Sequence, residues 1–293
     1  MTRTLPALIV AAAVGAWPIG AQEPAPAQTA APAAVPVPGK MDDDVPPAAE
    51  FVETALASSP RHGEWVDIPL EGGGVVRTWV VYPERSARAG AVIVVHENRG
   101  LNDWARAVAD QLAEDGFVAL AVDLLSGKGP EGGHTDSIPP ADVGKVLASL
   151  SRDEINARLD AVRYYAIQIP AANGRVGIVG FCWGGSTVFR YAVHQPALGA
   201  GVIYYGGAPQ EPELLARIEA PLLGLFGEDD ARVNTTVMSA LPVLNQERQV
   251  LDAHMFPGAG HGFLRQQYGR QANLRAAQRA WPLTVSFLRR HLE

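Results

Sequence analysis

Residues 175–189 decide the fold, and they read Arg175-Val-Gly-Ile-Val-Gly-Phe-Cys182-Trp-Gly-Gly-Ser-Thr-Val-Phe189. The opening run of small and β-branched residues predicts a buried strand, and the apolar run that continues to His194 predicts a helix. Cys182 lies at the turn between them, with Gly180 and Gly184 two positions away on either side. A residue at the tip of so sharp a turn is forced toward strained backbone angles, and flanking glycines relieve the crowding.

The pattern Gly-x-Cys-x-Gly predicts a nucleophile elbow with cysteine in place of serine. At a helix N-terminus, unpaired N–H groups and the helix dipole favour a thiolate over a thiol. The alternative is a structural cysteine beside helix-packing glycines, which is the usual fate of a lone cysteine. The strand before Cys182 and the helix after it favour the elbow.

Composition limits the classes of function that the chain can have. The 293 residues carry a formal net charge of −7 and show no basic stripe, so we expect no nucleic-acid partner. The single cysteine cannot form a disulfide within the chain. Because no His, Cys and Asp cluster has the spacing of metal ligands, we expect neither a metal nor a cofactor.

The first 50 residues predict an exported protein. An apolar, Ala-rich run over residues 5–16, followed by Gly20-Ala21, indicates a signal peptide over residues 1–21. An uncleaved anchor is the alternative, but the run is short and interrupted by proline. Residues 22–50 are rich in Ala and Pro and predict a disordered linker before a domain over residues 51–293. We therefore expect a periplasmic or secreted protein with no membrane span after cleavage.

The domain predicts an α/β fold with one large sheet. Two alternating segments, 64–70 and 75–82, are typical of an antiparallel hairpin at a sheet edge. Apolar runs then alternate with helical stretches, of which one is expected to have Asp103 as its N-cap. The expected strands after the hairpin cover residues 91–95, 117–122, 176–180, 201–205, 221–226 and 250–256. This alternation predicts a mostly parallel, doubly wound sheet covered by helices on both faces.

In such a sheet, functional residues lie just beyond the carboxyl ends of the strands. A thiol, a carboxylate and an imidazole follow three of the expected strands in the order Cys182, Asp230, His261, which is the order of catalytic triads on this sheet. His261 would then exchange a proton with Cys182 while Asp230 holds its ring. Competing assignments make Asp229 or Glu228 the acid, or His254 the base.

Backbone N–H groups near the nucleophile predict an oxyanion hole. The N–H of Trp183 follows the nucleophile directly, and the N–H of Asn98 lies in the loop after the strand over residues 91–95. Donors from these two places stabilise a tetrahedral oxyanion in hydrolases with this kind of turn.

Six ordered motifs resemble the dienelactone hydrolase family over roughly residues 64–292. They are His96-Glu97-Asn98-Arg99-Gly100, Asp123-Leu, Gly-Phe-Cys182-Trp-Gly-Gly185, Tyr204-Tyr-Gly206, Gly-Glu-Asp-Asp230 and Gly-Ala-Gly-His261-Gly-Phe-Leu-Arg265. The resemblance implies an α/β-hydrolase fold with a Cys–His–Asp triad made of Cys182, His261 and Asp230.

The resemblance also implies roles for residues around the triad. Glu97 matches a glutamate that interacts with the resting thiol, and Arg265 matches an arginine that holds a substrate carboxylate. The family's second substrate arginine, soon after the Asp-Leu pair, is missing here, and Lys128 is the loose substitute. We expect Glu97 to keep Cys182 protonated until substrate binds, although a surface salt bridge between Glu97 and Arg99 is the alternative.

The sequence therefore predicts a monomeric hydrolase that cleaves a small carboxylic ester or lactone through an acyl-enzyme. Arg265, Trp183 and Tyr205 indicate an anionic or aromatic acyl group. One alternative is a broad carboxylesterase without lactone preference. The other is a non-catalytic domain in which Cys182 is an oxidisable thiol that senses redox state.

Overall fold

The computed structural model describes residue 1 and residues 44–246 and 250–293. The predicted signal peptide beyond residue 1, and the predicted linker as far as residue 43, lie outside the described residues. The helices and strands of the expected domain all belong to the compact unit Pro38–Glu293.

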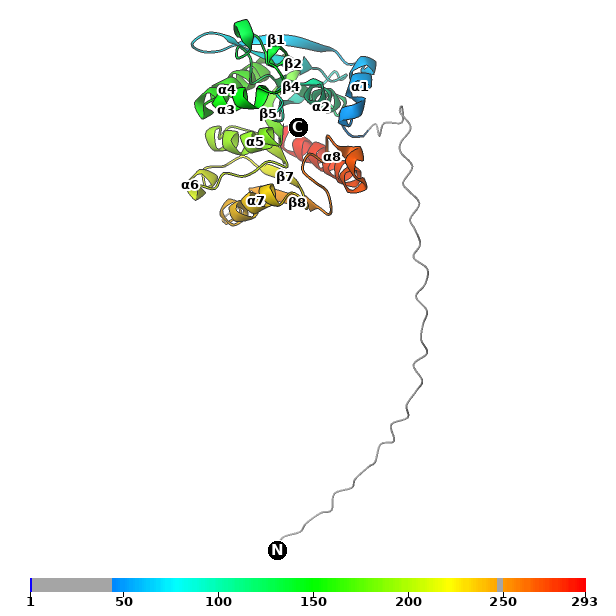
Figure 1. Ribbon diagram of the computed structural model, residues 1–293, viewed down its shortest axis with the longest axis vertical. Coiled ribbons are helices and arrows are strands. Elements are labelled where there is room, and N and C mark those ends of the chain that lie inside the picture. The colour runs from blue at the N-terminus through cyan, green and yellow to red at the C-terminus, as the bar shows by residue number, and fades with distance from the viewer. Residues whose placement is uncertain (2–43, 247–249) are drawn as a thin grey trace. The chain divides into compact units, whose positions relative to one another are not determined.

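One sheet of eight strands runs through the unit in the order β1-β2-β4-β3-β5-β6-β7-β8 (Figure 1). β2 pairs antiparallel with both β1 and β4, and every other neighbouring pair is parallel. The strands are β1 (Gly63–Pro69), β2 (Val75–Val81), β3 (Ala89–Val95), β4 (Val118–Val122), β5 (Ala172–Phe181), β6 (Ala200–Tyr204), β7 (Leu222–Gly227) and β8 (Leu251–Phe256). The expected mostly parallel sheet with an antiparallel hairpin at one edge is confirmed.

Burial explains the two kinds of strand sequence. β3, β4, β6 and β7 are buried along their whole length, which is why they read as unbroken apolar runs. β1 lies at the edge and alternates, and Gly72, Gly73 and Gly74 turn the chain into β2 with positive φ angles. β5 lies between β3 and β6, so the segment that leads to Cys182 is held from both sides.

Helices cover both faces of the sheet, and each face has its own apolar core (Figure 1). One face is covered by α3 (Val143–Ser149), α4 (Arg152–Gln168), α5 (Trp183–His194), α6 (Pro212–Leu215) and α7 (Ala231–Leu244). The other is covered by α1 (Val52–Ser58), α2 (Asp103–Glu114) and α8 (Gln271–Leu292). Short 3-10 helices lie at Ala49–Phe51, Pro130–Gly132, Thr135–Ser137 and Gln267–Gly269.

The N-cap of α2 differs by one residue from the expected position. Asn102 has extended backbone angles, and its side-chain oxygen accepts a hydrogen bond from the Ala105 N–H at 3.1 Å. Asp103 is already helical and pairs with Arg106 instead. The prediction of Asp103 as the cap was wrong because two adjacent residues both have cap chemistry, and backbone conformation chooses between them.

Residues 45–50 belong to the folded unit and not to the linker. Val45 and Ala48 are buried, although their neighbours are prolines. The carbonyls of Pro46 and Pro47 accept hydrogen bonds at 2.7 Å from the Gln267 Nε2 and at 3.1 Å from the Trp104 Nε1. The expected linker boundary at residue 50 was therefore too late, because composition does not reveal the donors that such carbonyls meet on the domain surface.

A buried carboxylate organises the Gly- and Pro-rich loop after β4. Asp123 accepts hydrogen bonds from the Leu125 N–H at 2.9 Å, the Thr135 N–H at 2.9 Å and the Thr135 hydroxyl at 2.6 Å. These contacts join the two ends of the loop beside the catalytic edge of the sheet. Within residues 44–246 and 250–293, none of the helices has the length and apolarity needed to cross a membrane.

Candidate active site

Cys182 occupies a strained turn between β5 and α5. Its φ and ψ are 55° and −113°, and it fills the N-cap position of α5. Its N–H donates to the Tyr204 carbonyl at 3.0 Å, and its carbonyl accepts from the Ser186 N–H at 3.1 Å. Backbone angles of this kind cost on the order of 1–3 kcal/mol in a residue with a side chain. The surrounding sheet and helix therefore hold the thiol in a conformation that it would not adopt alone.

The flanking glycines are required by the close approach of backbone segments. A Cβ on Gly184 would lie 2.5 Å from the His96 carbonyl oxygen, and one on Gly180 would lie 2.5 Å from the carbonyl carbon of Gly184. Real side chains do not fit at these distances. Gly184 is thus required by the packing of the α5 N-terminus against the end of β3, and Gly180 by the close approach of β5 to the first turn of α5.

Asp230 contacts His261 across two adjacent strand ends. Its Oδ2 accepts from the His261 Nδ1 at 2.5 Å, and its Oδ1 accepts from the Val233 N–H at 3.4 Å at the start of α7. Asp229 instead pairs with Arg270 at 2.6 Å, and Glu228 accepts from the Gly258 N–H at 2.9 Å. Of the three consecutive acids, Asp230 is the one that the structure brings to the imidazole, and it also caps the helix.

His261 lies between Asp230 and Cys182. The hydrogen bond with Asp230 is the main cause that raises the pKa of His261 to about 9, and a hydrogen bond with Cys182 acts in the same direction. Partial burial of the ring opposes both. Because Nδ1 faces Asp230, Nε2 is the atom left for the thiol. His261 is therefore hydrogen-bonded to Asp230 on one side and has Cys182 as its neighbour on the other.

Tyr205 lies against the His261 ring and not in an open substrate pocket. The two ring centroids are 5.1 Å apart at an interplanar angle of 62°. Tyr205 is fully buried with a φ of 40°, and its hydroxyl has no hydrogen-bond partner among the described residues. Burial raises the pKa of Tyr205 well above its ordinary value, and the charge of Glu97 adds to the effect. The Tyr205 ring packs against the imidazole at a steep angle and limits where the imidazole can move.

Glu97 and Arg265 form a buried ion pair beside the triad. The Glu97 Oε2 lies 2.7 Å from the Arg265 Nε, and the two side chains are 6% and 18% exposed. Burial raises the pKa of Glu97, while the charges of Arg265, His261 and Arg99 oppose that rise in this order. The alternative of a surface salt bridge between Glu97 and Arg99 is wrong, because Glu97 is buried and its ion-pair partner is Arg265.

A groove of about 1090 Å³ adjoins this ion pair. Asn98, Arg99 and Arg265 line it together with the start of α2, and Ala49 and Val52 form part of its wall. The N-terminal segment that composition assigned to the linker therefore contributes to a cavity next to the site. Trp183 is the first residue of α5, and its ring stacks on that of His96 with 5.7 Å between the centroids.

The structure does not bring every candidate residue to the thiol. The Lys128 Nζ lies 2.7 Å from the Glu154 Oε1, and Glu154 also forms an ion pair with Arg158. Lys128 is therefore paired with an acidic residue of α4 and does not face the thiol. His254, the competing base, pairs with Asp252 on β8. Among the described residues there is no group of three or more His, Cys, Asp or Glu side chains that could hold a metal ion.

The family model for dienelactone hydrolases matches residues 76–292, which include the elbow, Asp230 and His261. This chain belongs to the dienelactone hydrolase family. Its curated relatives include a protein of Saccharolobus solfataricus assigned as a carboxymethylenebutenolidase, which is 29% identical over 74% of this chain and 95% of that one. Another is a Bradyrhizobium protein assigned as a 2-oxo-3-(5-oxofuran-2-ylidene)propanoate lactonase, which is 31% identical over 78% of this chain and 94% of that one.

Solved structures agree with membership of the dienelactone hydrolase family. A dienelactone hydrolase-like protein of Klebsiella pneumoniae is 26% identical, with a TM-score of 0.65 over 75% of this chain and 98% of that one. The carboxylesterase EstE1, from a metagenomic library, is 14% identical with a TM-score of 0.61 over 84% of this chain and 95% of that one, and shares the fold. The chain is therefore an α/β-hydrolase of the class that cleaves lactones and esters.

Proposed function

We propose that this dienelactone hydrolase-family protein cleaves a small carboxylic ester or lactone through a thioester on Cys182. The observation that carries the proposal is the His261–Asp230 hydrogen bond beside Cys182, which is held on a strained turn. Because the pKa of His261 is raised to about 9, the thiol proton has an acceptor only in the molecules whose imidazole is neutral. In those molecules the Cys182 sulfur attacks the acyl carbon, and its proton passes to His261. As the C–O bond breaks, His261 gives that proton to the leaving alkoxide.

The second half of the reaction regenerates the thiol. Water attacks the thioester carbon while His261 accepts a proton from the water, and the acid leaves as the carbon–sulfur bond breaks. The sulfur takes the proton back from His261, so the proton count closes over one cycle. In both halves, the N–H groups of Trp183 and Asn98 are the proposed donors to the developing oxyanion, as their positions at the α5 N-terminus and after β3 support.

The ion pair of Glu97 and Arg265 supports an anionic acyl substrate. Arg265 lines the groove next to the triad but is already neutralised by Glu97. A substrate carboxylate that binds Arg265 therefore competes with Glu97 for the guanidinium. Arg99 is a nearby cation in the same groove and is better placed than Lys128 to contact the substrate.

Turnover of p-nitrophenyl acetate and of an aromatic lactone tests the proposal. Cys182→Ala should lose at least about a thousandfold in turnover, as expected for removal of a nucleophile. Asp230→Asn should lose much more than the matched control Asp229→Asn, since Asp229 contacts Arg270 and not His261. Equal rates in wild type and Cys182→Ala would leave only a non-catalytic role for the thiol.

We also propose that the protein is exported. The apolar run and small residues before position 22 support cleavage near Ala21 and release to the periplasm or the medium. N-terminal sequencing of the protein recovered from a periplasmic fraction should begin close to residue 22. Recovery of the intact Met1 terminus in the cytoplasm would contradict export.

A further inference from the structure

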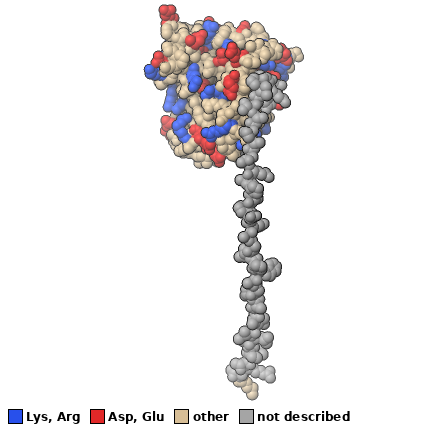
Figure 2. Space-filling model, turned by 45° about the vertical axis from the view of Figure 1, so that its right-hand side comes forward, with Lys and Arg blue, Asp and Glu red and all other residues tan. Residues whose placement is uncertain are grey.

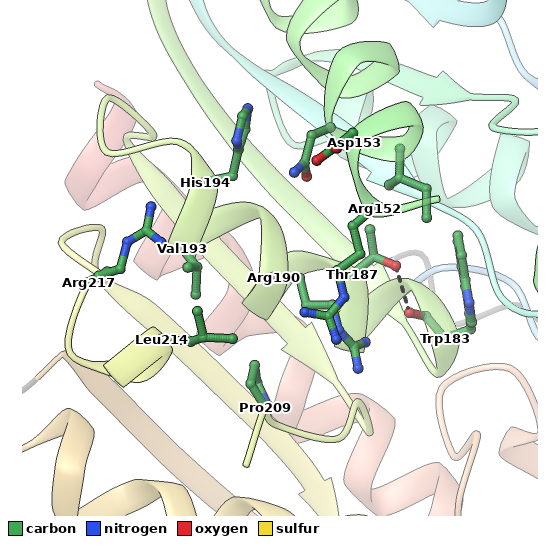
Figure 3. Close-up of a pocket in the computed structure, with 12 residues that line it drawn as sticks. Arg152, Asp153, Trp183, Thr187, Arg190, Val193, His194, Pro209, Leu214 and Arg217 are labelled. Atoms are coloured by element: carbon green, nitrogen blue, oxygen red, sulfur yellow. Dashed lines mark hydrogen bonds between the residues drawn. The ribbon is translucent and has the colours of Figure 1, made fainter. Parts of the chain in front are cut away.

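A second cavity lies on the outer side of α5, away from the groove that adjoins Arg265. It is open to solvent and has a volume of about 330 Å³ between the first turn of α4, one face of α5 and the segment 209–217 (Figure 3). Trp183, which follows the nucleophile directly, lines one end of it. Both helices begin at the edge of the sheet where the strands end, so this cavity opens near the catalytic edge.

Three arginines from separate elements line this cavity. Arg152 comes from α4, Arg190 from α5 and Arg217 from the segment after α6. In the described part of the chain, none of their guanidinium groups forms an ion pair or a side-chain hydrogen bond. Asp153 lines the same cavity and Glu211 acts on Arg190 from a distance, so the positive charge exceeds the negative.

Asp160, the acidic residue of α4 that contacts α5, is already paired with other side chains. Asp160 accepts from the Tyr191 hydroxyl at 2.9 Å and the Gln195 amide at 3.0 Å, and it pairs with His194 at 2.7 Å. All of these partners of Asp160 lie at the C-terminal end of α5. Nothing in this network compensates the guanidinium of Arg190.

The like charges of Arg152 and Arg190 act on each other. Both side chains are exposed, but neighbouring atoms partly desolvate the Arg190 guanidinium. This desolvation is the main cause that lowers the pKa of Arg190, and the charge of Arg152 is the second. Figure 3 shows both side chains reaching into the same part of the cavity. The N-terminus of α4, where Ser151 caps the Glu154 N–H, adds its positive dipole end. An anion between these groups would relieve the repulsion, and a guanidinium fork matches an oxyanion in geometry.

We propose that this cavity binds a small organic oxyanion with a doubly charged head group. The head group lies between Arg152 and Arg190. The apolar part of the lining, Ile155, Val193 and Leu214, contacts the carbon skeleton of the ligand. No step of the proposed thioester chemistry uses these residues, so the site stands or falls independently of the triad.

Calorimetric titration with phenylphosphonate at fixed ionic strength tests the site, and inorganic phosphate serves as the probe of the head group alone. Arg190→Gln and Arg152→Gln should each weaken phenylphosphonate binding roughly tenfold or more, since each removes a charge-assisted hydrogen bond. Arg175→Gln is the matched control, because it removes the same charge from an exposed position on β5 outside the cavity. Equal affinity in all three variants, or no binding by wild type, would overturn the proposal.

The melting temperature without ligand is a second measurement. If Arg190 only stabilised the fold, its removal would lower the melting temperature. At low ionic strength, Arg190→Gln should melt no lower than wild type, because it removes a like-charge repulsion, and phosphate should no longer raise its melting temperature. A lower melting temperature together with retained stabilisation by phosphate would contradict the site.

A kinetic arm separates the two sources of such an anion. If the oxyanion is part of the ester substrate, phenylphosphonate inhibits competitively, and Arg190→Gln raises KM for esters with an acidic tail but not for p-nitrophenyl acetate. If it is a separate ligand, it binds without competition. In either case, binding of phenylphosphonate requires Arg152 and Arg190. If binding does not change in Arg152→Gln or Arg190→Gln, both explanations are excluded.

Discussion

Glycine at position 182 should give a more stable protein than alanine at the same position, in contrast to the usual effect of glycine. With φ at 55° and ψ at −113°, any residue with a Cβ is strained at this position by about 1–3 kcal/mol. Glycine accepts these angles without strain. It also loses more backbone entropy on folding than alanine does, which costs about 0.5–1 kcal/mol.

The comparison that isolates the strain is Cys182→Gly against Cys182→Ala, because both lack sulfur and only the alanine variant keeps a Cβ. When the entropy cost of glycine is subtracted from the backbone strain, Cys182→Gly should be more stable than Cys182→Ala by about 0–2.5 kcal/mol, with a central value near 1 kcal/mol. For a domain of this size, that corresponds to a melting temperature about 2–4 °C higher.

Urea unfolding of the two variants measures this difference directly. The matched control is Ala157→Gly, at an exposed position in the middle of α4. There, glycine should cost about 1 kcal/mol relative to the parent alanine. If Cys182→Gly is less stable than Cys182→Ala by the same amount, the turn is not strained and the reasoning fails.

Three other variants probe the site itself. Because its pKa is raised to about 9, protonated His261 stabilises the fold fully below its unfolded value of about 6.5, and this contribution disappears as pH rises through 9. The His261 ring is 34% exposed, so screening by solvent reduces this contribution to on the order of 1 kcal/mol. In urea unfolding, the free energy of unfolding of wild type should fall by that amount more than that of His261→Gln between pH 6 and about pH 9.5. An equal change in both proteins would contradict the assignment. Glu97→Gln should react with iodoacetamide several-fold faster than wild type near neutral pH, since it removes the negative charge that we expect to keep the thiol protonated; an equal or slower rate would count against that role. Gly184→Ala should cost about 1–3 kcal/mol and most of the activity, because its Cβ meets the carbonyl of His96; wild-type turnover in this variant would show that the elbow adjusts freely.

The elbow and the strand ends were predictable because local rules determine them. Gly180 and Gly184 mark the tight turn in the sequence itself, and parallel strands must carry Cys182, Asp230 and His261 to the same edge of the sheet. Charges are interspersed over the face seen in Figure 2, which agrees with the absence of a basic stripe in the sequence.

The contacts that sequence reasoning missed join segments that are distant in the chain. Nothing local to Glu97 indicates that its partner is Arg265, since that contact depends on how the loops after β3 and β8 pack. The same applies to residues 45–50, whose carbonyls meet donors from Trp104 and Gln267. The arginines at 152, 190 and 217 come from three separate elements, so no spacing rule could group them.

The central claim is that the acyl group passes through the sulfur of Cys182. Rapid quenching of wild type and His261→Gln with p-nitrophenyl acetate, together with intact-protein mass spectrometry and peptide mapping, tests it most directly. We predict a mass increase of one acetyl group, mapped to Cys182 and absent from Cys182→Ala, that persists longer in His261→Gln because deacylation needs the base. Full turnover without any adduct on Cys182, or an adduct of equal size in Cys182→Ala, would contradict the claim.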